Sequence, residues 1–114
     1  MKIIIPYFGR LLEFIPYFLL TAKRSKRIDF LIYTEQKVEQ FSKVNAQNIS
    51  FDTLKKKIQS KFDFRISLDT LYKLCDYKVA YGFIFKEELE NYDYWQFCDT
   101  DVLLGDIYHF FRRE

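Results

Sequence analysis

Short, continuously apolar runs alternate with stretches of helical periodicity along this chain, and no other feature constrains its fold as strongly. The first run, at residues 2–5, consists of isoleucines after a lysine and stops at Pro6. The second covers residues 28–34, IDFLIYT. Strands that are apolar at nearly every position suit a parallel sheet covered on both faces, and their alternation with helices is typical of βαβ units. We therefore predict an α/β fold.

Helical segments follow these runs. The first helix is expected to begin close to Pro16, because proline is tolerated in a first turn; its apolar positions are Leu11, Leu12, Ile15, Phe18, Leu19 and Ala22. A second helix, capped by Ser50 or Asp52, carries one apolar stripe made of Leu54, Ile58 and Phe62. Residues 71–89 are predicted to be mostly helical, with an inward face of Val79, Ala80, Phe83 and Ile84. Within them, Gly82 would permit the close approach of another backbone or a ligand.

Two more strands and a final helix complete the predicted domain. Residues 48–51 form a short third strand, and residues 94–98, YWQFC, form an aromatic-rich fourth. A short helix follows Gly105, with Asp106 as its N-cap. The result is a Rossmann-like, mostly parallel sheet of about four strands flanked by helices, in one domain spanning residues 1–114.

Composition and charge favour a packed domain and argue against general nucleic-acid binding. Apolar residues make up 49% of the chain, which is enough for a core. A net charge of +2 gives no strong field to attract nucleic acid. Basic residues do cluster at 23–27 and 55–57. We interpret these clusters as solvated helix ends and faces; an anionic partner such as a membrane surface is the alternative.

Cysteine usage and the lack of long apolar segments bear on location. Cys75 and Cys98 lie in apolar surroundings without metal-type spacing, so two buried, reduced thiols are expected rather than a disulfide. The N-terminal apolar run is too short for a signal-peptide core, and no stretch reaches the ~20 residues of a membrane span. We therefore expect a cytoplasmic protein, with peripheral contact to the inner face of the membrane left open.

The strongest signal for chemistry is Asp99-Thr100-Asp101, at the end of the fourth predicted strand. Two carboxylates two residues apart can converge on one Mg²⁺ or Mn²⁺, which commonly shares such oxygen ligands with substrate phosphates. The cation would stabilise a diphosphate leaving group. Alone, the motif also fits a solvated turn. Its place at the carboxyl edge of the sheet, where open α/β sheets bind their ligands, favours a site.

A second signal is the turn Pro6-Tyr7-Phe8-Gly9, at the carboxyl end of the first strand. In a doubly wound sheet the first strand neighbours the fourth, so this turn would face the acidic pair across one crevice. Tyr7 or Phe8 could stack on a base, and Gly9 could let backbone approach a phosphate. A plain strand-to-helix turn with core aromatics is the alternative.

Polar groups on the predicted 71–89 helix give a third, weaker signal. Lys73, Asp76 and Lys78 on an otherwise apolar helix suggest a task near a phosphate or ribose, with an ordinary surface ion pair as the alternative. His109 follows the acidic pair too closely to complete its coordination sphere, so we interpret it as an exposed or helix-end histidine.

The order of these segments resembles a known family. IIPYFG, IDFLIYTE, SFDTLKKKIQSKFDFRISLDTLYKLCDYKVAYGFIF and YDYWQFCDTDVLLGDI are similar to a bacterial family, long described only as a domain of unknown function, whose members are regarded as glycosyltransferases with a GT-A-like core. The resemblance covers nearly the whole chain. Its most specific parts are YKLCDYK…AYG…F and CD-x-DV-x-x-GD.

The resemblance implies a GT-A-type fold and a UDP-sugar-like donor bound between the first-strand turn and the Asp-x-Asp motif, with Mn²⁺ or Mg²⁺ bridging its diphosphate. Carried onto this chain, Asp99 and Asp101 are the metal positions. The implied nucleotide-sugar-binding residues are Pro6, Tyr7, Phe8, Gly9, Glu35, Lys73, Asp76, Lys78 and Thr100. No catalytic residue is assigned.

The chain also departs from the family pattern. Glu35 stands where relatives usually have aspartate, and Val79 where proline is common. Family members continue well past the Asp-x-Asp motif, into a half that supplies the acceptor site and further metal and catalytic groups. We therefore expect the donor-binding part of a metal-dependent glycosyltransferase that acts on a saccharide or lipid-linked acceptor. A truncated, non-catalytic nucleotide-binding or interaction module is the alternative.

Two other readings fail on these residues. A haloacid-dehalogenase-like phosphohydrolase also places Asp-x-Asp after an apolar strand, but it needs that motif early in the chain, with lysine and acidic motifs downstream. Leu103, moreover, stands where threonine or valine is expected. Nucleic-acid binding is not expected, because the aromatic residues mostly fall on predicted core strands and helix stripes.

Overall fold

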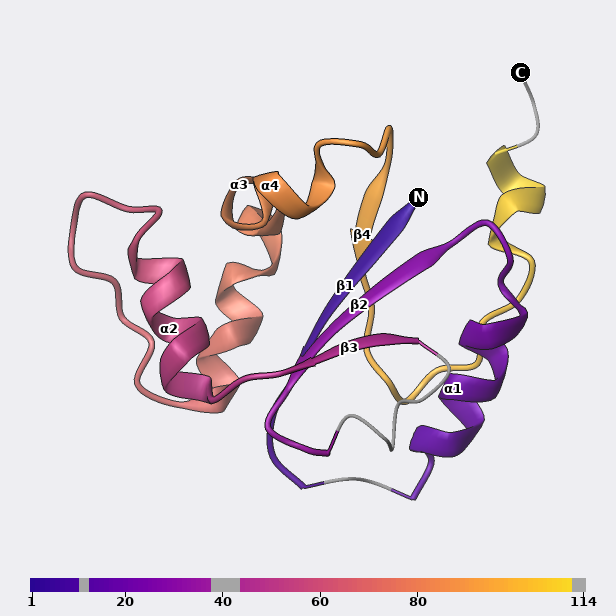
Figure 1. Cartoon of the computed structure of the whole chain (residues 1–114), viewed down its shortest axis with the longest axis horizontal. Coiled ribbons are helices and arrows are strands. Elements are labelled where there is room, and N and C mark those ends of the chain that lie inside the picture. The colour runs from indigo at the N-terminus through magenta and orange to yellow at the C-terminus, as the bar shows by residue number, and fades with distance from the viewer. Residues whose placement is uncertain (11–12, 38–43, 112–114) are drawn as a thin grey trace.

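Figure 1 shows the computed structural model of the protein, which describes residues 1–10, 13–37 and 44–111. Its centre is a four-stranded sheet in the order β3-β2-β1-β4, and every neighbouring pair is parallel. The strands are β1 (Lys2–Tyr7), β2 (Asp29–Thr34), β3 (Asn45–Asn48) and β4 (Trp95–Phe97). The predicted α/β class and mostly parallel, Rossmann-like sheet are therefore confirmed.

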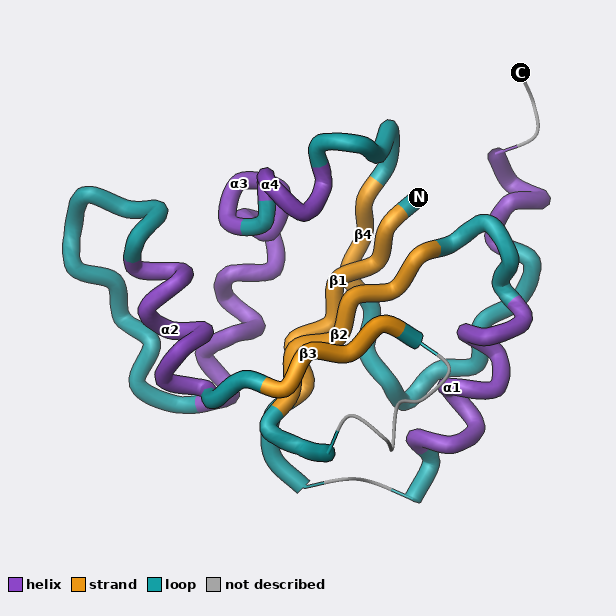
Figure 2. Tube along the Cα trace, in the orientation of Figure 1, coloured by secondary structure: helices purple, strands orange, loops and turns teal. Residues whose placement is uncertain are grey.

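Both faces of the sheet are buried, which explains the continuously apolar strands. Successive side chains of a strand point to opposite faces. In β1, Ile3 and Ile5 belong to one core cluster and Ile4 to the other. Phe30 and Ile32 of β2 likewise join the first cluster, and their neighbours along the strand join the second. Figure 2 shows the helices on both sides of the strands.

Helix α1 (Ile15–Arg24), which was predicted to begin close to Pro16, covers the first face. Pro16 lies in its first turn, where a missing amide donor costs nothing. Its buried residues recur at helical spacing: Ile15, Phe18, Leu19 and Ala22. Leu11 and Leu12, assigned to the same helix from sequence, lie outside the described residues. The short 3-10 helix η3 (Ile107–Phe111) packs near α1 and begins one residue after Asp106, the predicted N-cap.

The second face is covered by α2 (Phe51–Gln59) and a series of shorter elements: η2 (Leu71–Ala80), α3 (Tyr81–Ile84) and α4 (Lys86–Leu89). Ser50 is the N-cap of α2, because its hydroxyl accepts a hydrogen bond from the Thr53 amide at 3.0 Å. Leu54 and Ile58 are fully buried, as predicted. Phe62 lies beyond the helix end and is only partly buried.

The third strand was predicted wrongly. It is Asn45–Asn48 rather than residues 48–51, because Ser50 already caps α2 and Phe51 is its first residue. The strand reads NAQN and, among the residues that the structure describes, pairs with β2 alone, so it forms an edge of the sheet. A polar edge strand carries no apolar run for a sequence pattern to detect.

The inward face predicted for residues 71–89 was also partly wrong. Ile84 is fully buried, but Val79 is 86% exposed and Phe83 53%. A 3-10 helix has three residues per turn instead of 3.6, so an apolar stripe drawn for one continuous α-helix is misplaced. The prediction of buried thiols fails at Cys75, which is exposed, while Cys98 is partly buried; both are free.

Gly82 does permit a close approach, but its neighbour is a side chain rather than backbone or ligand. A Cβ added at Gly82 would lie 2.8 Å from Cζ2 of the Trp95 indole. The lone tryptophan of β4 therefore packs directly against the α3 backbone. No helix among residues 1–10, 13–37 and 44–111 is long and apolar enough to cross a membrane.

Candidate functional site

A cleft of about 310 Å³ opens at the carboxyl edge of the sheet, beside the neighbouring strands β1 and β4. Ile4 of β1 lies opposite Phe97 of β4, so the residues that follow both strands emerge at the same edge. One side of the cleft is lined by Pro6, Tyr7 and Phe8, and another by Cys98, Asp99, Thr100 and Asp101. The structure therefore brings the first-strand turn and the acidic pair into one cavity.

The acidic segment presents its two carboxylates to solvent and its central residue to the interior. Thr100 is 8% exposed, whereas Asp99 and Asp101 are both exposed. Both carboxylates are thus accessible to solvent at the cleft, and Thr100, between them, is buried.

Lys78 supplies the positive charge of the cleft. Its Nζ lies 3.0 Å from Oδ1 of Asp99 and 5.4 Å from the centre of the Phe97 ring, and its side chain is only 25% exposed. The hydrogen bond to Asp99 raises the pKa of Lys78, although burial works in the opposite direction. The ammonium group therefore stays charged at neutral pH beside the acidic pair.

Cys98 lines the same cleft but is a poor nucleophile. Burial raises the pKa of its thiol to about 11, and the negative charge of Asp99 acts in the same direction. The thiolate is the reactive form of cysteine. The thiol is therefore protonated at neutral pH, which gives this residue a packing role.

The remaining wall of the cleft is apolar. It contains Phe14, Leu71 and Leu74. Phe8 is fixed by an edge-on contact with Phe51, with ring centres 5.7 Å apart. An apolar wall combined with a few charged groups is typical of sites that bind a ligand with a flat apolar part and a polar part.

Four of the predicted site residues lie outside this cleft lining: Gly9, Glu35, Lys73 and Asp76. Oε1 of Glu35 accepts a hydrogen bond from the Phe51 amide at 2.6 Å, so it satisfies the N-terminus of α2. Lys73 and Asp76 pair with each other at 3.7 Å, and both side chains are largely exposed. Such a pair contributes little to stability. The structure therefore favours the ordinary surface ion pair for Lys73 and Asp76.

Gly9 has a conformational role next to the cleft. Its φ of 106° is the positive φ that side-chain-bearing residues rarely adopt, and glycine allows the turn after β1. The carbonyl of Gly9 accepts a hydrogen bond from the side chain of Gln36, which follows β2. The turn that carries Tyr7 and Phe8 is thereby tied to the neighbouring strand end.

Several lining residues were missed from sequence, and their signal was their place on the helix that carries Lys78. Four residues of η2 line the cleft: Lys78, which was predicted, and Leu71, Leu74 and Cys75, which were not. Lys73 and Asp76, on the same helix, are absent from the cleft lining. Polar groups were the signal sought on this helix, so the two leucines and the cysteine were passed over.

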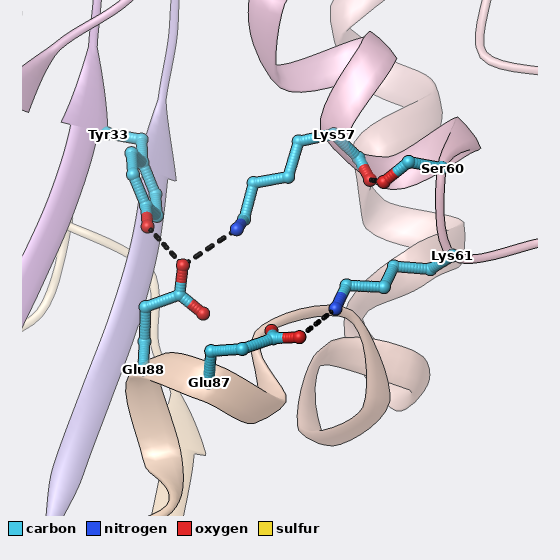
Figure 3. A network of polar contacts seen from close by, with 6 residues as sticks. All are labelled: Tyr33, Lys57, Ser60, Lys61, Glu87 and Glu88. Carbon is cyan, nitrogen blue, oxygen red and sulfur yellow. Dashed lines mark hydrogen bonds and ion pairs between the residues drawn. The ribbon is translucent and has the colours of Figure 1, made fainter.

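The η2–α3–α4 segment is held to the sheet by a polar network (Figure 3). Oε1 of Glu88 lies 2.7 Å from Nζ of Lys57 and accepts a hydrogen bond from the Tyr33 hydroxyl at 3.2 Å. Glu87 pairs with Lys61. Burial opposes ionisation of Glu88, but the hydrogen bond from Lys57 and neighbouring interactions hold its pKa below the ordinary value. The network ties α4 to α2 and to β2.

Asp99 and Asp101 are the two carboxylates of the cleft that could contribute to holding a cation. In the described parts of the chain, no three side chains of His, Cys, Asp and Glu are grouped so that they could hold a metal by themselves. Mg²⁺ is usually held by one or two carboxylates together with substrate phosphates. Asp99 and Asp101 match that donor set. His109, on η3, is not part of the cleft lining.

Comparison with known proteins gives a family but no activity. A family model described as "Family of unknown function (DUF6625)" matches residues 3–114, a range that contains both the first-strand turn and the acidic pair. No curated protein and no solved structure shows significant similarity to the chain. Any function must therefore be argued from the cleft itself.

Proposed function

The chain belongs to the DUF6625 family of unknown function, and we propose that its cleft binds the nucleoside diphosphate of a sugar donor for metal-dependent glycosyl transfer. One observation carries the proposal: the Pro6–Phe8 turn and the Asp99–Asp101 segment line a single cavity at the carboxyl edge of a parallel sheet. Ligands of open α/β sheets bind at this edge, between neighbouring strands.

The charged groups of the cleft suit a diphosphate. Lys78 is held in place by Asp99 and Phe97 and would act as a point charge on a phosphate oxygen. Asp99 and Asp101 would hold Mn²⁺ or Mg²⁺ jointly with the diphosphate. When bound, such a cation neutralises the diphosphate and makes it a better leaving group.

The apolar wall suits the nucleoside. Tyr7 and Phe8 both line the cleft, together with Phe14 and Leu71. Aromatic side chains offer flat faces against which a base can stack. The diphosphate would then lie toward Lys78, with the sugar beyond it.

The reaction implied is transfer of the sugar to a saccharide or lipid-linked acceptor. The bond between the anomeric carbon and the diphosphate oxygen breaks, and the nucleoside diphosphate leaves with the electron pair. The anomeric carbon forms a bond to the acceptor oxygen, and the acceptor hydroxyl releases its proton to water. A cytoplasmic location forms part of this proposal. It is supported by Cys75 and Cys98, which are both free thiols.

Calorimetry with UDP, GDP and CDP, each with and without Mn²⁺, tests the site. We expect one nucleotide to bind only when Mn²⁺ is present, and Asp101→Ala to abolish this binding. Asp76→Ala is the matched control, because Asp76 is an exposed aspartate outside the cleft lining. Silence of all three nucleotides, or equal binding by Asp101→Ala and the parent chain, would reject the proposal.

A stability measurement separates a binding role of Asp101 from a structural one. Asp101 is exposed, so Asp101→Asn is expected to weaken Mn²⁺-dependent binding while the melting temperature stays nearly unchanged. A large drop in melting temperature would mark Asp101 as a structural turn residue. Incubation with a sugar nucleotide then separates enzyme from module: binding without release of the nucleoside diphosphate would favour a non-catalytic nucleotide-binding module.

A further inference from the structure

Exposed cations gather at the end of α1 and in the connection to β2, a segment that we call the basic loop. They are Lys23, Arg24, Lys26 and Arg27. None forms an ion pair with a carboxylate of residues 1–10, 13–37 or 44–111. Cations in the last turn of a helix stabilise its negative end, which accounts for Lys23 and Arg24. Lys26 and Arg27 come after the helix, so stabilisation of the helix end does not explain their presence.

The outer face of α1 places apolar side chains beside these cations. Tyr17 is 64% exposed and Leu20 44%. They recur with Arg24 at helical spacing, so all three lie on the side opposite the buried stripe. A helix that only covers a sheet would carry polar side chains there.

The segment after the acidic pair extends this surface. The amide of Leu104 donates to the Thr21 hydroxyl at 3.1 Å, which fixes the segment against α1. Its neighbour Leu103 is 71% exposed. Exposed apolar side chains thus come from two segments that are distant in sequence and adjacent in space.

A hollow of about 480 Å³ lies between the basic loop and residues 104–108. Its lining includes three of the cations, and the ring of Tyr108 lies 5.7 Å from the guanidinium of Arg27. One carboxylate, Asp106, also lines it. Three cations against one carboxylate leave a net positive recess, which suits an anionic headgroup.

We propose that the outer face of α1, the basic loop and Leu103 together dock the protein on the surface of an anionic lipid bilayer. A face that combines exposed leucine and tyrosine with lysine and arginine matches the way in which interfacial helices bind: the apolar side chains enter the acyl boundary and the cations contact lipid phosphates. A nucleic acid fits less well, because leucine side chains neither stack on bases nor bond to phosphates.

The cationic part of this surface lies away from the cleft, so the inference does not depend on the proposed function. The basic loop precedes β2 and so lies at the amino edge of the sheet, whereas the cleft lies at the carboxyl edge. In Figure 1, α1 and α2 lie at opposite sides of the molecule. Docking through α1 is therefore compatible with a nucleotide-free as well as a nucleotide-binding cleft.

Vesicle flotation of the full chain tests the docking. We expect binding to vesicles of phosphatidylcholine mixed with phosphatidylglycerol, no binding to phosphatidylcholine alone, and weakening as salt rises. Neutralising Arg24, Lys26 and Arg27 to glutamine should lower the partition coefficient roughly a hundredfold, at about a factor of five per cation. The matched control changes the same number of cations at the other side of the molecule: Lys55→Gln, Lys56→Gln and Lys86→Gln.

Each outcome decides the question. Failure of the parent chain to float with anionic vesicles, or an equal loss in the control triple variant, overturns the proposal. The pair Tyr17→Ser and Leu20→Ser should weaken vesicle binding roughly tenfold, since apolar area no longer enters the bilayer. If this pair leaves vesicle binding unchanged while a single-stranded oligonucleotide displaces the vesicles, the surface is a nucleic-acid site and the bilayer proposal is wrong. Circular dichroism of every variant checks that it is folded.

Discussion

On one face of the sheet, the ten-residue helix α1 buries four side chains at regular helical spacing. On the other face, α2 is followed by a 3-10 helix and two helical turns of four residues each. The first face is held by apolar contacts around Phe18. The second combines an apolar core with the Tyr33–Glu88–Lys57 network and the Trp95–Gly82 contact.

This difference shows how the fold divides its tasks. A regular helix buries one stripe completely, so the inner face of α1 is fully used for packing. Short turns cannot form long hydrogen-bonded ladders, so they depend on polar ties and on individual close contacts. In return, they present side chains such as Leu71 and Lys78 to the cleft. The candidate site therefore takes Lys78 and part of its apolar wall from the less regular face.

The largest effect is expected from breaking the regular face. Phe18 is 1% exposed and packs edge-on against Phe30, with ring centres 6.1 Å apart. Phe18→Ala should lower the free energy of unfolding by about 3–5 kcal/mol, because it removes a large buried ring and leaves a cavity. Urea denaturation measures the loss. Tyr17→Ala is the control, with a change within about 0.5 kcal/mol, since its side chain is mostly exposed. Equal losses would show that α1 does not pack on the sheet through this stripe.

An intermediate effect is expected where the irregular face meets β4. A Cβ at position 82 would lie within 3.0 Å of three atoms of the Trp95 indole. Gly82→Ala should therefore displace the indole, at a cost of about 1–3 kcal/mol for overpacking. Because Trp95 is the only tryptophan, its fluorescence spectrum should shift in the folded variant. Combining Gly82→Ala with Trp95→Phe should recover part of the loss; no coupling between the two changes would contradict the contact.

The same division explains how much of the fold could be predicted from sequence. The strands β1 and β2 are mostly apolar, and the apolar residues of α1 recur at helical spacing. Each of these elements could therefore be recognised from the pattern of its apolar residues. Parallel pairing of β1 with β4 then follows from topology, and it places the turn after Pro6 near Asp99. The N-cap at Ser50 could be predicted from the local sequence, because the preference for serine at this position does not depend on tertiary contacts.

The irregular face was predicted less well, for physical reasons. The edge strand Asn45–Asn48 has hydrogen bonds but almost no apolar side chains to bury. In η2, three residues per turn rotate Val79 out to solvent. Glu35 was assigned to the ligand from a family pattern, whereas its carboxylate is used by the N-terminus of α2. A motif gives the residue type, but the competition between a ligand and a nearby helix end is decided in three dimensions.

The smallest effect concerns the polar tie of the irregular face. Glu88→Gln keeps the size of the side chain but removes its charge opposite Lys57. We expect a loss of roughly 1 kcal/mol at neutral pH, since the pair is partly exposed and an amide replaces only some of its hydrogen bonds. Glu87→Gln is the matched control. Its carboxylate is largely exposed beside Lys61, so its loss should be smaller.

The pH dependence of this difference tests its electrostatic origin. The pKa of Glu88 is lower in the folded state than its ordinary value, so its charge stabilises the fold above the unfolded-state pKa of about 4.3. As the pH falls through the lower folded-state pKa, Glu88 takes up a proton and that contribution disappears. The free energies of unfolding of the parent chain and Glu88→Gln, measured by urea denaturation, should therefore differ at pH 7 and converge in acid. If the difference in free energy of unfolding persists unchanged at the lowest pH at which both proteins fold, Glu88 acts through shape and hydrogen bonding rather than charge. The irregular face would then be held without a contribution from this charge, as the regular face is.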